Sequence, residues 1–211
     1  MARGLLGSKC KKCRRASEKL FLKGDRCDSA KCAIARRPYA PGVHGKNMSR
    51  GLSEYGKQLA MKQRIKRMYG VLEKQFRKHY KEIENKPGVT GDLLMERLEM
   101  RLDNIVRKIG FANSPIQARQ LVTHGLFTIN GKKNTIPSYR VKVGDVIGIK
   151  ESKKEKPYFK NQIQLIQAKK NFPRWIQFDI SKMEGKIIAS ITREDIGIHV
   201  DPQMVVESYS R

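Results

Sequence analysis

The chain has 211 residues, of which 45 are Lys or Arg and 20 are Asp or Glu, so its formal net charge is +25. A basic excess of this size is typical of proteins that bind a polyanion, usually a nucleic acid, with an acidic membrane surface as the alternative. No run approaches the roughly 18 consecutive apolar residues of a membrane-spanning helix, and the first residues lack the apolar core of a signal peptide. We therefore expect a cytoplasmic protein of one or two domains.

The charge is concentrated toward the N-terminus. Residues 1–90 hold 24 basic and 7 acidic side chains, a net of +17, whereas residues 91–211 hold 21 and 13, a net of +8. All four cysteines lie within the first 32 residues. This asymmetry predicts a basic arm that meets a nucleic acid, and the cysteines argue against its alternative, a flexible solvated tail.

The four cysteines form two closely spaced pairs. Cys10 and Cys13 are separated by two residues, and Cys27 and Cys32 by four. Two such pairs supply the four soft ligands of a closed tetrahedral site, so we expect one structural Zn²⁺ ion, and neighbouring lysines and arginines favour the thiolate forms. Two disulfides, four free thiols or iron–sulfur ligation are the alternatives, and disulfides fit poorly with a chain lacking an export signal. His44 is a further ligand candidate, but four cysteines already complete the shell.

A basic, Pro- and Gly-rich loop and a long helix follow the arm. Residues 33–51 are expected to be loop or linker. Residues 54–84 are expected to form one helix, because Tyr69, Leu72, Phe76 and Tyr80 recur on one helical face while lysines and arginines fill much of the remainder. The residues Lys-Pro-Gly at 86–88 end this block.

Two shorter helices are expected next. Residues 92–109 keep an apolar period of 3.6 and stop at Gly110. A second helix begins at Ser114, which can cap it, with Pro at the first helical position and Gln117 placed to complete a capping box. Gly125 follows His124 as the natural end of this helix.

Short strands complete this segment. Residues 126–130 are expected to form a strand that turns at Asn130-Gly131, a tight hairpin signal. Residues 134–141 look extended, with Pro137 indicating an edge or a bulge. Residues 142–145 form a turn before a strand at 146–149. Two helices thus precede three or four short strands.

Candidate RNA contacts occur in the arm, in the long helix and in this compact segment. Basic side chains, amide donors and capped helix N-termini suit phosphate and sugar contacts. A surface Arg is often only solvated, so we expect about half of the candidates in the compact segment to contact RNA. His124 has the alternative role of a capping cation at a helix C-terminus. The candidates are Arg14, Arg15, Arg36, Arg37, Lys46, Arg50, Lys57, Lys62, Arg64, Arg67, Arg101, Arg107, Ser114, Gln117, Arg119, Gln120, Thr123, His124, Lys132 and Lys133.

Catalysis is not expected. Asp103 and Asp145 are the candidate acids, but neither is accompanied by a convincing catalytic constellation, and no phosphate-cradling glycine loop or metal-hydrolase motif appears. Two alternatives stay open, namely an RNA-modifying enzyme that holds its substrate with this segment and a zinc-containing antitermination or translational regulator.

Several stretches resemble a known family. Residues 100–106 (MRLDNIV), 110–112 (GFA), 117–125 (QARQLVTHG), 129–132 (INGK), 136–139 (IPSY) and 143–147 (VGDVI) are similar to the RNA-binding domain named after small-subunit ribosomal protein S-four. Residues 36–45, 52–59, 67–76 and 205–210 resemble the bacterial S-four family itself, and the four cysteines match its zinc-bearing branch.

The resemblance implies an α+β architecture with three parts. A zinc arm at residues 1–45 leads into a mostly helical domain of residues 46–98 and 164–211, into which a small α/β RNA-binding module of residues 99–163 is inserted. Trp175, Ile176 and Phe178 would then be core residues of the helical domain.

The resemblance also implies a function in the small (30S) ribosomal subunit. Family members bind a multi-helix junction of 16S ribosomal RNA directly and early, nucleate assembly of the subunit body and influence translational accuracy. Their partners include ribosomal protein S-five and other small-subunit proteins, and some members repress translation of their own messenger RNA.

Overall fold

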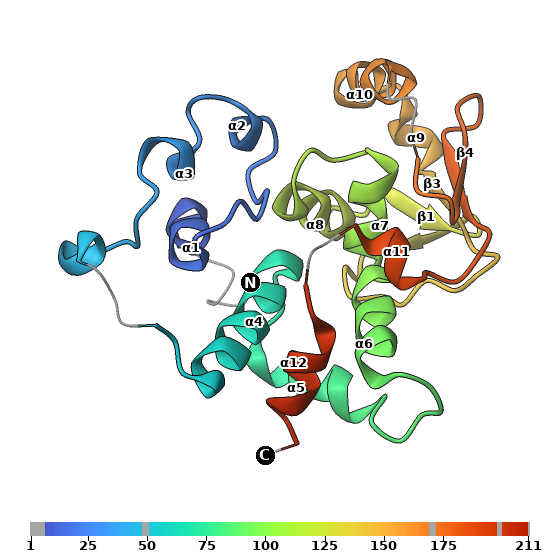
Figure 1. Cartoon of the computed structure of the whole chain (residues 1–211). Coiled ribbons are helices and arrows are strands. Elements are labelled where there is room, and N and C mark those ends of the chain that lie inside the picture. Colours follow the sequence, from blue (N-terminus) through green and yellow to red (C-terminus); the bar gives the residue numbers. More distant parts are fainter. Residues whose placement is uncertain (1–6, 48–50, 169–171, 198–199, 211) are drawn as a thin grey trace. The chain divides into compact units, whose positions relative to one another are not determined.

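The computed structural model describes residues 7–47, 51–168, 172–197 and 200–210 (Figure 1). The chain divides into two compact units, Met1–Leu94 with Ile198–Arg211, and Met95–Gly197. The passage from the first unit to the second falls within helix α6 (Thr90–Glu99). No helix in the described part of the chain is both long and apolar enough to cross a membrane.

The first unit begins with an arm of short helices. These are α1 (Lys9–Ala16), α2 (Asp25–Asp28), α3 (Ala33–Arg36) and the 3-10 helix η2 (Val43–Lys46). Its small core consists of Cys13, Leu20 and Leu22, with Ile34 and Met68 packed against them. Because Cys13 belongs to this core, apolar packing within the arm also holds the cysteine region in place.

The expected helix over residues 54–84 is two helices. Helix α4 (Glu54–Tyr69) is capped by Ser53 and ends at Gly70, and α5 (Glu73–Lys81) follows. Gly70 has a φ of 61°, a backbone conformation that costs free energy for residues with a Cβ atom. Its N–H donates to the carbonyl of Lys66. The prediction of one continuous helix is therefore wrong, because an αL glycine cap lies in the middle of the periodic pattern.

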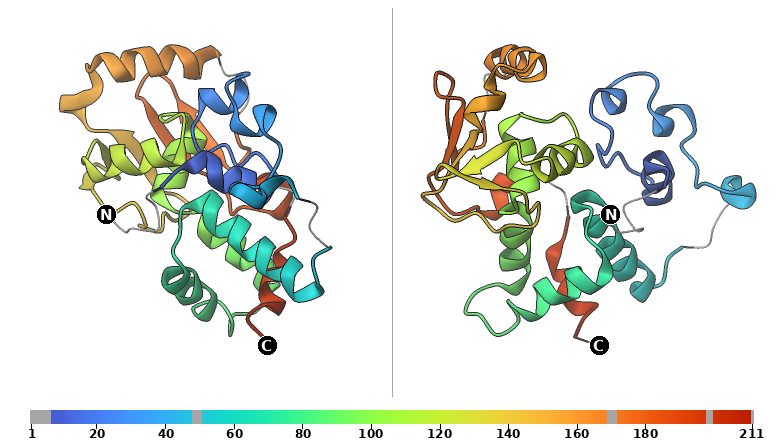
Figure 2. Two further views of the ribbon diagram at one scale, coloured as in Figure 1. Left: turned by 90° about the vertical axis from the view of Figure 1, so that its left-hand side faces the viewer. Right: turned by 180° about the vertical axis from the view of Figure 1, so that it is seen from behind.

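The C-terminal residues return to this unit as α12 (Pro202–Glu207), which lies beside α4 (Figure 2). The side-chain amide of Gln58 donates to Glu207 Oε2 at 2.9 Å. Beyond α12, the ring of Tyr209 stacks on Tyr80 and Phe76, with centroid distances of 4.7 and 6.1 Å. Aromatic packing thus joins the end of the chain to α5.

The expected helix over residues 92–109, which begins in the first unit and continues into the second, is interrupted. Helix α6 ends at Glu99, and α7 (Leu102–Ile109) begins after Arg101. The N–H groups of Leu102 and Asp103 donate to the carbonyls of Tyr139 and Pro137. The loop therefore caps α7 from a distant part of the sequence, which local periodicity does not reveal.

Helix α8 (Pro115–Thr123) begins and ends as expected. Ser114 Oγ accepts from the N–H of Gln117 at 3.3 Å, and the helix ends at Thr123, followed by His124 as its C-cap and Gly125 with a φ of 65°. The expected reciprocal bond is shifted by one residue, because Gln117 Oε1 accepts from the N–H of Asn113 rather than from that of Ser114. The N-terminus of α8 is thus held by two side chains.

An antiparallel five-stranded sheet has the order β2-β1-β3-β5-β4. Its strands are β1 (Phe127–Ile129), β2 (Lys132–Asn134), β3 (Val146–Ile149), β4 (Ile176–Asp179) and β5 (Glu184–Ile187). The hairpin at Asn130-Gly131 is confirmed, with φ values of 49° and 79°. The expected extended segment 134–141 leaves the sheet after Asn134 and makes one isolated bridge, between Arg101 and Arg140.

Residues 150–197 complete the second unit. Helices α9 (Glu151–Lys154) and α10 (Pro157–Ala168) follow β3, and α11 (Arg193–Ile196) follows β5. Trp175 and Ile176 are buried here and Phe178 packs against Phe111, so these three residues do not belong to the first unit as expected. The physical reason is β5, which pairs with the edge of β3 and thereby holds residues 176–187 in this sheet.

Candidate RNA-binding surface and cysteine cluster

The four cysteines surround one small cavity. Cys10, Cys13, Cys27 and Cys32 line a space of about 20 Å³ together with apolar and basic residues of the arm. All four are free thiols, and three of them are buried. The two cysteine pairs thus lie at one cavity, and the Zn²⁺ site expected from their spacing stays a prediction.

Backbone N–H groups point at two of the sulfur atoms. The N–H of Lys23 donates to Cys27 Sγ at 3.4 Å, and that of Leu20 hydrogen-bonds to Cys13. Burial, reinforced by the neighbouring thiols, nevertheless raises the pKa of Cys13 above its usual value. Four soft donors with N–H support have the chemistry of a Zn²⁺ site. As placed, however, no group of three or more His, Cys, Asp or Glu side chains among the described residues is arranged to hold a metal ion.

Beside this cluster, basic side chains of α1 and α4 crowd one another. Burial and then repulsion from Arg15 lower the pKa of Arg67, and burial and then repulsion from Arg67 lower the pKa of Lys12. An anion placed among Lys12, Arg15 and Arg67, here named the α1–α4 cation cluster, would relieve this repulsion. Sequence reasoning selected Arg15 and Arg67 but not Lys12, although Lys12 and Arg15 are three residues apart on one helix.

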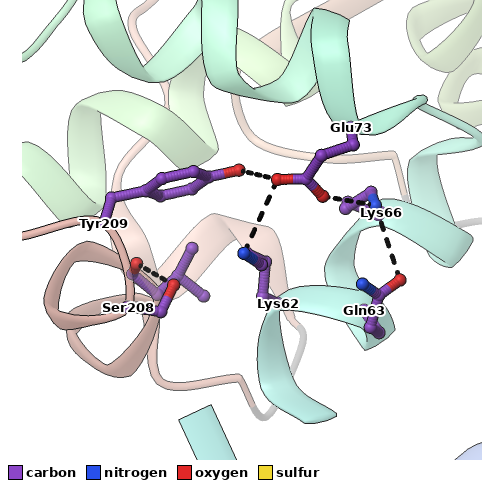
Figure 3. Close-up of polar contacts among 7 residues, drawn as sticks. Lys62, Gln63, Lys66, Glu73, Ser208 and Tyr209 are labelled. Atoms are coloured by element: carbon purple, nitrogen blue, oxygen red, sulfur yellow. Dashed lines mark hydrogen bonds and ion pairs between the residues drawn. The ribbon is translucent and has the colours of Figure 1, made fainter. Parts of the chain in front are cut away.

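Two predicted contacts on α4 are engaged within the protein. Arg64 forms an ion pair with Glu18, and Lys62 lies 3.5 Å from Glu73 and 4.6 Å from the ring centroid of Tyr209. Figure 3 shows Lys62 and Lys66 converging on the Glu73 carboxylate, which also accepts from the hydroxyl of Tyr209. Lys62 thus joins α4 to α5, and Arg64 joins α4 to the segment that follows α1, so both are less suited to bind RNA than the sequence suggests.

Other predicted contacts of the first unit differ in their surroundings. Arg14 donates to the carbonyls of Tyr39 and Ala40 and lies over the Tyr39 ring, so it holds the arm loop to α1. Lys46 lies over the same ring at 5.5 Å, and Lys57 pairs with Glu54 at the surface. Arg36 and Arg37 are exposed. Arg50 lies outside the described residues.

In the second unit, Arg101 is 2% exposed and is not a surface residue. Its guanidinium donates twice to the carboxylate of Asp103, at 2.7 and 3.0 Å, and Arg119 lies 3.6 Å from the same carboxylate. Arg101 therefore does not lie on the exposed face of a helix, as the sequence predicts, but precedes α7 and balances a buried charge. Asp103 is likewise structural in this arrangement.

The remaining candidates of the second unit lie on α7, α8 and the hairpin. Gln120, His124, Lys132 and Lys133 are exposed, and Ser114, Gln117, Arg107 and Arg119 are half-buried. The Thr123 hydroxyl donates to the carbonyl of Arg119, so this donor is already used within α8. The capped N-terminus of α8, together with exposed lysines at the hairpin, provides the donors and positive charge that bind a phosphate backbone.

Comparison with known families first defines the class of protein. Residues 100–147 match the S4 domain, and residues 4–99 match the ribosomal protein S4/S9 N-terminal domain. The S4-domain match covers α7, α8, β1, β2 and the beginning of β3. The match to the N-terminal domain covers the arm, α4, α5 and α6. The chain is therefore a protein of the S4-domain class.

Similar proteins extend the match over nearly the whole chain. The small ribosomal subunit protein uS4 of Acetivibrio thermocellus is 49% identical over 205 residues, which are 97% of this chain and 98% of that protein. The corresponding protein uS4A of Clostridium novyi is 50% identical over 206 residues, or 98% of each chain, and uS4 of Solidesulfovibrio magneticus is 49% identical over 204 residues, or 97% of each. The chain belongs to the small ribosomal subunit protein uS4 family.

Proposed function

We propose that this protein is a structural component of the small ribosomal subunit that binds 16S ribosomal RNA directly at a multi-helix junction. In this role it nucleates assembly of the subunit body and contributes to translational accuracy, next to ribosomal protein S-five. The full-length similarity to proteins named for the small subunit is the observation that carries the proposal. We propose as a secondary role that it controls translation of its own messenger RNA, as the family resemblance implies for some members.

The charge distribution supports RNA as the partner. Both units present cations at their surfaces: the first in the α1–α4 cation cluster and at Arg36 and Arg37, the second at Lys132 and Lys133. A protein that clamps several RNA helices lowers the free energy of the folded junction by linkage, because it binds the folded form preferentially. Recognition then depends on RNA shape, phosphates and 2′-hydroxyls rather than on a linear sequence.

Filter binding to a five-way-junction fragment of small-subunit RNA tests the proposal. We expect much tighter binding to the junction than to an unrelated duplex of equal length at moderate salt, with affinity falling steeply as salt rises. Replacing Arg15 and Arg67 with Gln should lower the slope of log K against log salt by roughly one for each phosphate that the variant no longer binds. Lys182→Gln, at an exposed turn, is the matched control. Equal affinity for both RNAs contradicts the proposal.

We propose in addition that Cys10, Cys13, Cys27 and Cys32 hold one structural Zn²⁺ ion. Their convergence on one cavity supports this proposal. The backbone N–H groups that point at Cys13 and Cys27 support it as well, because such groups can hydrogen-bond the sulfur atoms of metal-bound cysteines. A bound ion would stabilise the arm, whose apolar core is small.

Metal analysis of the purified chain tests the zinc proposal without any activity assay. After anaerobic purification, native mass spectrometry should find one equivalent of zinc, and Cys27→Ser should lose most of it. Ser29→Ala, at the residue that follows α2, should keep the ion. Less than half an equivalent in the unaltered protein contradicts the proposal.

A further inference from the structure

Helix α10 and the short loop between α7 and α8 are joined by several specific contacts. The loop consists of residues 110–113 and leads directly into the capped N-terminus of α8. Helix α10 lies outside both segments that match family models. We infer that α10 is a brace that positions the RNA-binding N-terminus of α8, with Tyr158 and Gln162 as its positioning residues. This inference rests on the proposed function.

Three oxygen atoms of the loop accept hydrogen bonds from α10. The hydroxyl of Tyr158 donates to the carbonyl of Phe111 at 2.7 Å. The amide nitrogen of Gln162 donates to the carbonyl of Gly110 at 2.6 Å and to Asn113 Oδ1 at 2.9 Å. Both N–H groups of this amide are thereby used, and Gln162 is only 7% exposed. The loop therefore depends on α10 for partners to its polar atoms.

Apolar packing fixes the same two segments against each other. Phe111 and Phe159 are fully buried and meet edge to face, with a centroid distance of 6.4 Å. A Cβ at Gly110 would lie 3.1 Å from a side-chain carbon of Ile166, so the backbone approaches α10 closely at this point. Close packing converts a shift of α10 into a shift of the loop, because buried side chains leave little free volume.

The contacts continue from the loop into α8. Asn113 is held by α10 through its side chain and by Gln117 through its N–H, which donates to Gln117 Oε1 at 2.9 Å. Gln117 in turn donates its own N–H to Ser114 Oγ. Both Ser114 and Gln117 are predicted RNA contacts, so one hydrogen-bonded path from Gln162 to the predicted RNA contacts runs through Asn113.

Gln162 is too buried to contact RNA directly. Its side chain is buried and its donors are occupied, whereas Gln164, two residues further on, is exposed. A change at Gln162 therefore affects RNA binding only by moving residues 110–117. A change at Gln164 leaves this path intact and serves as the control.

Hydrogen exchange and RNA binding test the brace together. Gln162→Leu should leave the protein folded by circular dichroism but accelerate exchange of the amides of Asn113 and Gln117, and Tyr158→Phe should do so more weakly. Affinity for the junction fragment should fall roughly tenfold in Gln162→Leu, the size expected for one or two misplaced hydrogen bonds. Gln164→Leu should match the unaltered protein in both measurements.

A double-mutant cycle with Gln117→Ala identifies how Gln162 acts. If the brace acts through the N-terminus of α8, Gln162→Leu adds little to the loss of affinity already caused by Gln117→Ala. Fully additive losses, or unaltered affinity in Gln162→Leu, overturn the inference. If the unaltered protein does not prefer junction RNA, the proposed function is contradicted but the brace is not. Unchanged amide exchange at Asn113 and Gln117 in Gln162→Leu overturns the brace, whatever the RNA affinity.

Discussion

Replacing Tyr209 should release the end of the chain from α5. The Tyr209 ring stacks on Tyr80 and Phe76, and its hydroxyl donates to Glu73 Oε1 at 2.7 Å. Tyr209→Phe removes only the hydrogen bond, whose loss costs about 1 kcal/mol, because the Glu73 side chain is 46% exposed and solvent partly replaces the contact.

Tyr209→Ala removes the ring as well. Each aromatic pair adds about 0.5–1.5 kcal/mol beyond area burial, and the half-buried ring contributes about 1 kcal/mol of transfer free energy. We therefore expect Tyr209→Ala to lower the free energy of unfolding by about 3–5 kcal/mol in total, which corresponds to a decrease in Tm of roughly 6–20 °C for a chain of this length.

Urea unfolding followed by circular dichroism measures these differences. The exposed Tyr55, on α4 of the same unit, supplies the control Tyr55→Ala, which should change the free energy of unfolding by less than about 0.5 kcal/mol. A Tyr209→Ala protein as stable as the unaltered one would refute the reasoning. Equal losses in Tyr209→Phe and Tyr209→Ala would show that the rings contribute nothing.

Three further predictions concern stability. Gly70→Ala should cost about 1–2 kcal/mol in urea unfolding, because Ala must then adopt a φ of 61°, and no loss would show that the two helices can rejoin. Burial acts to raise the pKa of Glu73, but hydrogen bonds from Lys66 and Tyr209 outweigh it and lower the pKa overall. The ionised Glu73 carboxylate therefore stabilises the fold above its unfolded pKa of about 4.3, and this stabilisation is lost as the pH falls through the lower pKa of the folded state. The unaltered protein should thus be more stable than Glu73→Gln near neutral pH but not in acid. A stability difference that does not change with pH would contradict the lowered pKa. Asp103→Ala should cost about 3–5 kcal/mol in thermal and urea unfolding, because it leaves the buried Arg101 without its carboxylate partner. The control Glu151→Ala breaks an exposed ion pair and should cost little. Similar losses in both variants would contradict the structural role of Asp103.

Local signals in the sequence predicted several elements well. The Ser114 cap, the Gly125 end of α8 and the Asn130-Gly131 hairpin are each determined by residues a few positions apart, so their chemistry is visible in the sequence. Each cysteine pair is close in the sequence, whereas the meeting of the two pairs at one cavity depends on the fold of residues 14–26 between them. The break at Gly70 was visible as a glycine, but the apolar period continued across it and favoured one helix.

Features set by distant residues were not predictable in this way. The start of α7 depends on carbonyls of Pro137 and Tyr139, more than thirty residues further along the chain. The sequence predicts Arg101 as a surface cation, because the burial of its ion pair with Asp103 depends on how α7 packs in the folded unit. Likewise, the pairing of β5 with β3 places Trp175 in the second unit, although the resemblance implied the first.

Quantification of this chain in ribosomal fractions is the most direct test of its proposed role. Cell extract from a strain that carries a tagged copy can be separated on a sucrose gradient, with each fraction quantified by mass spectrometry. We predict one copy per small subunit, retained through a moderate-salt wash because many phosphate contacts must be broken together. Recovery mainly in ribosome-free fractions, or in small subunits at far less than one copy each, would contradict the account.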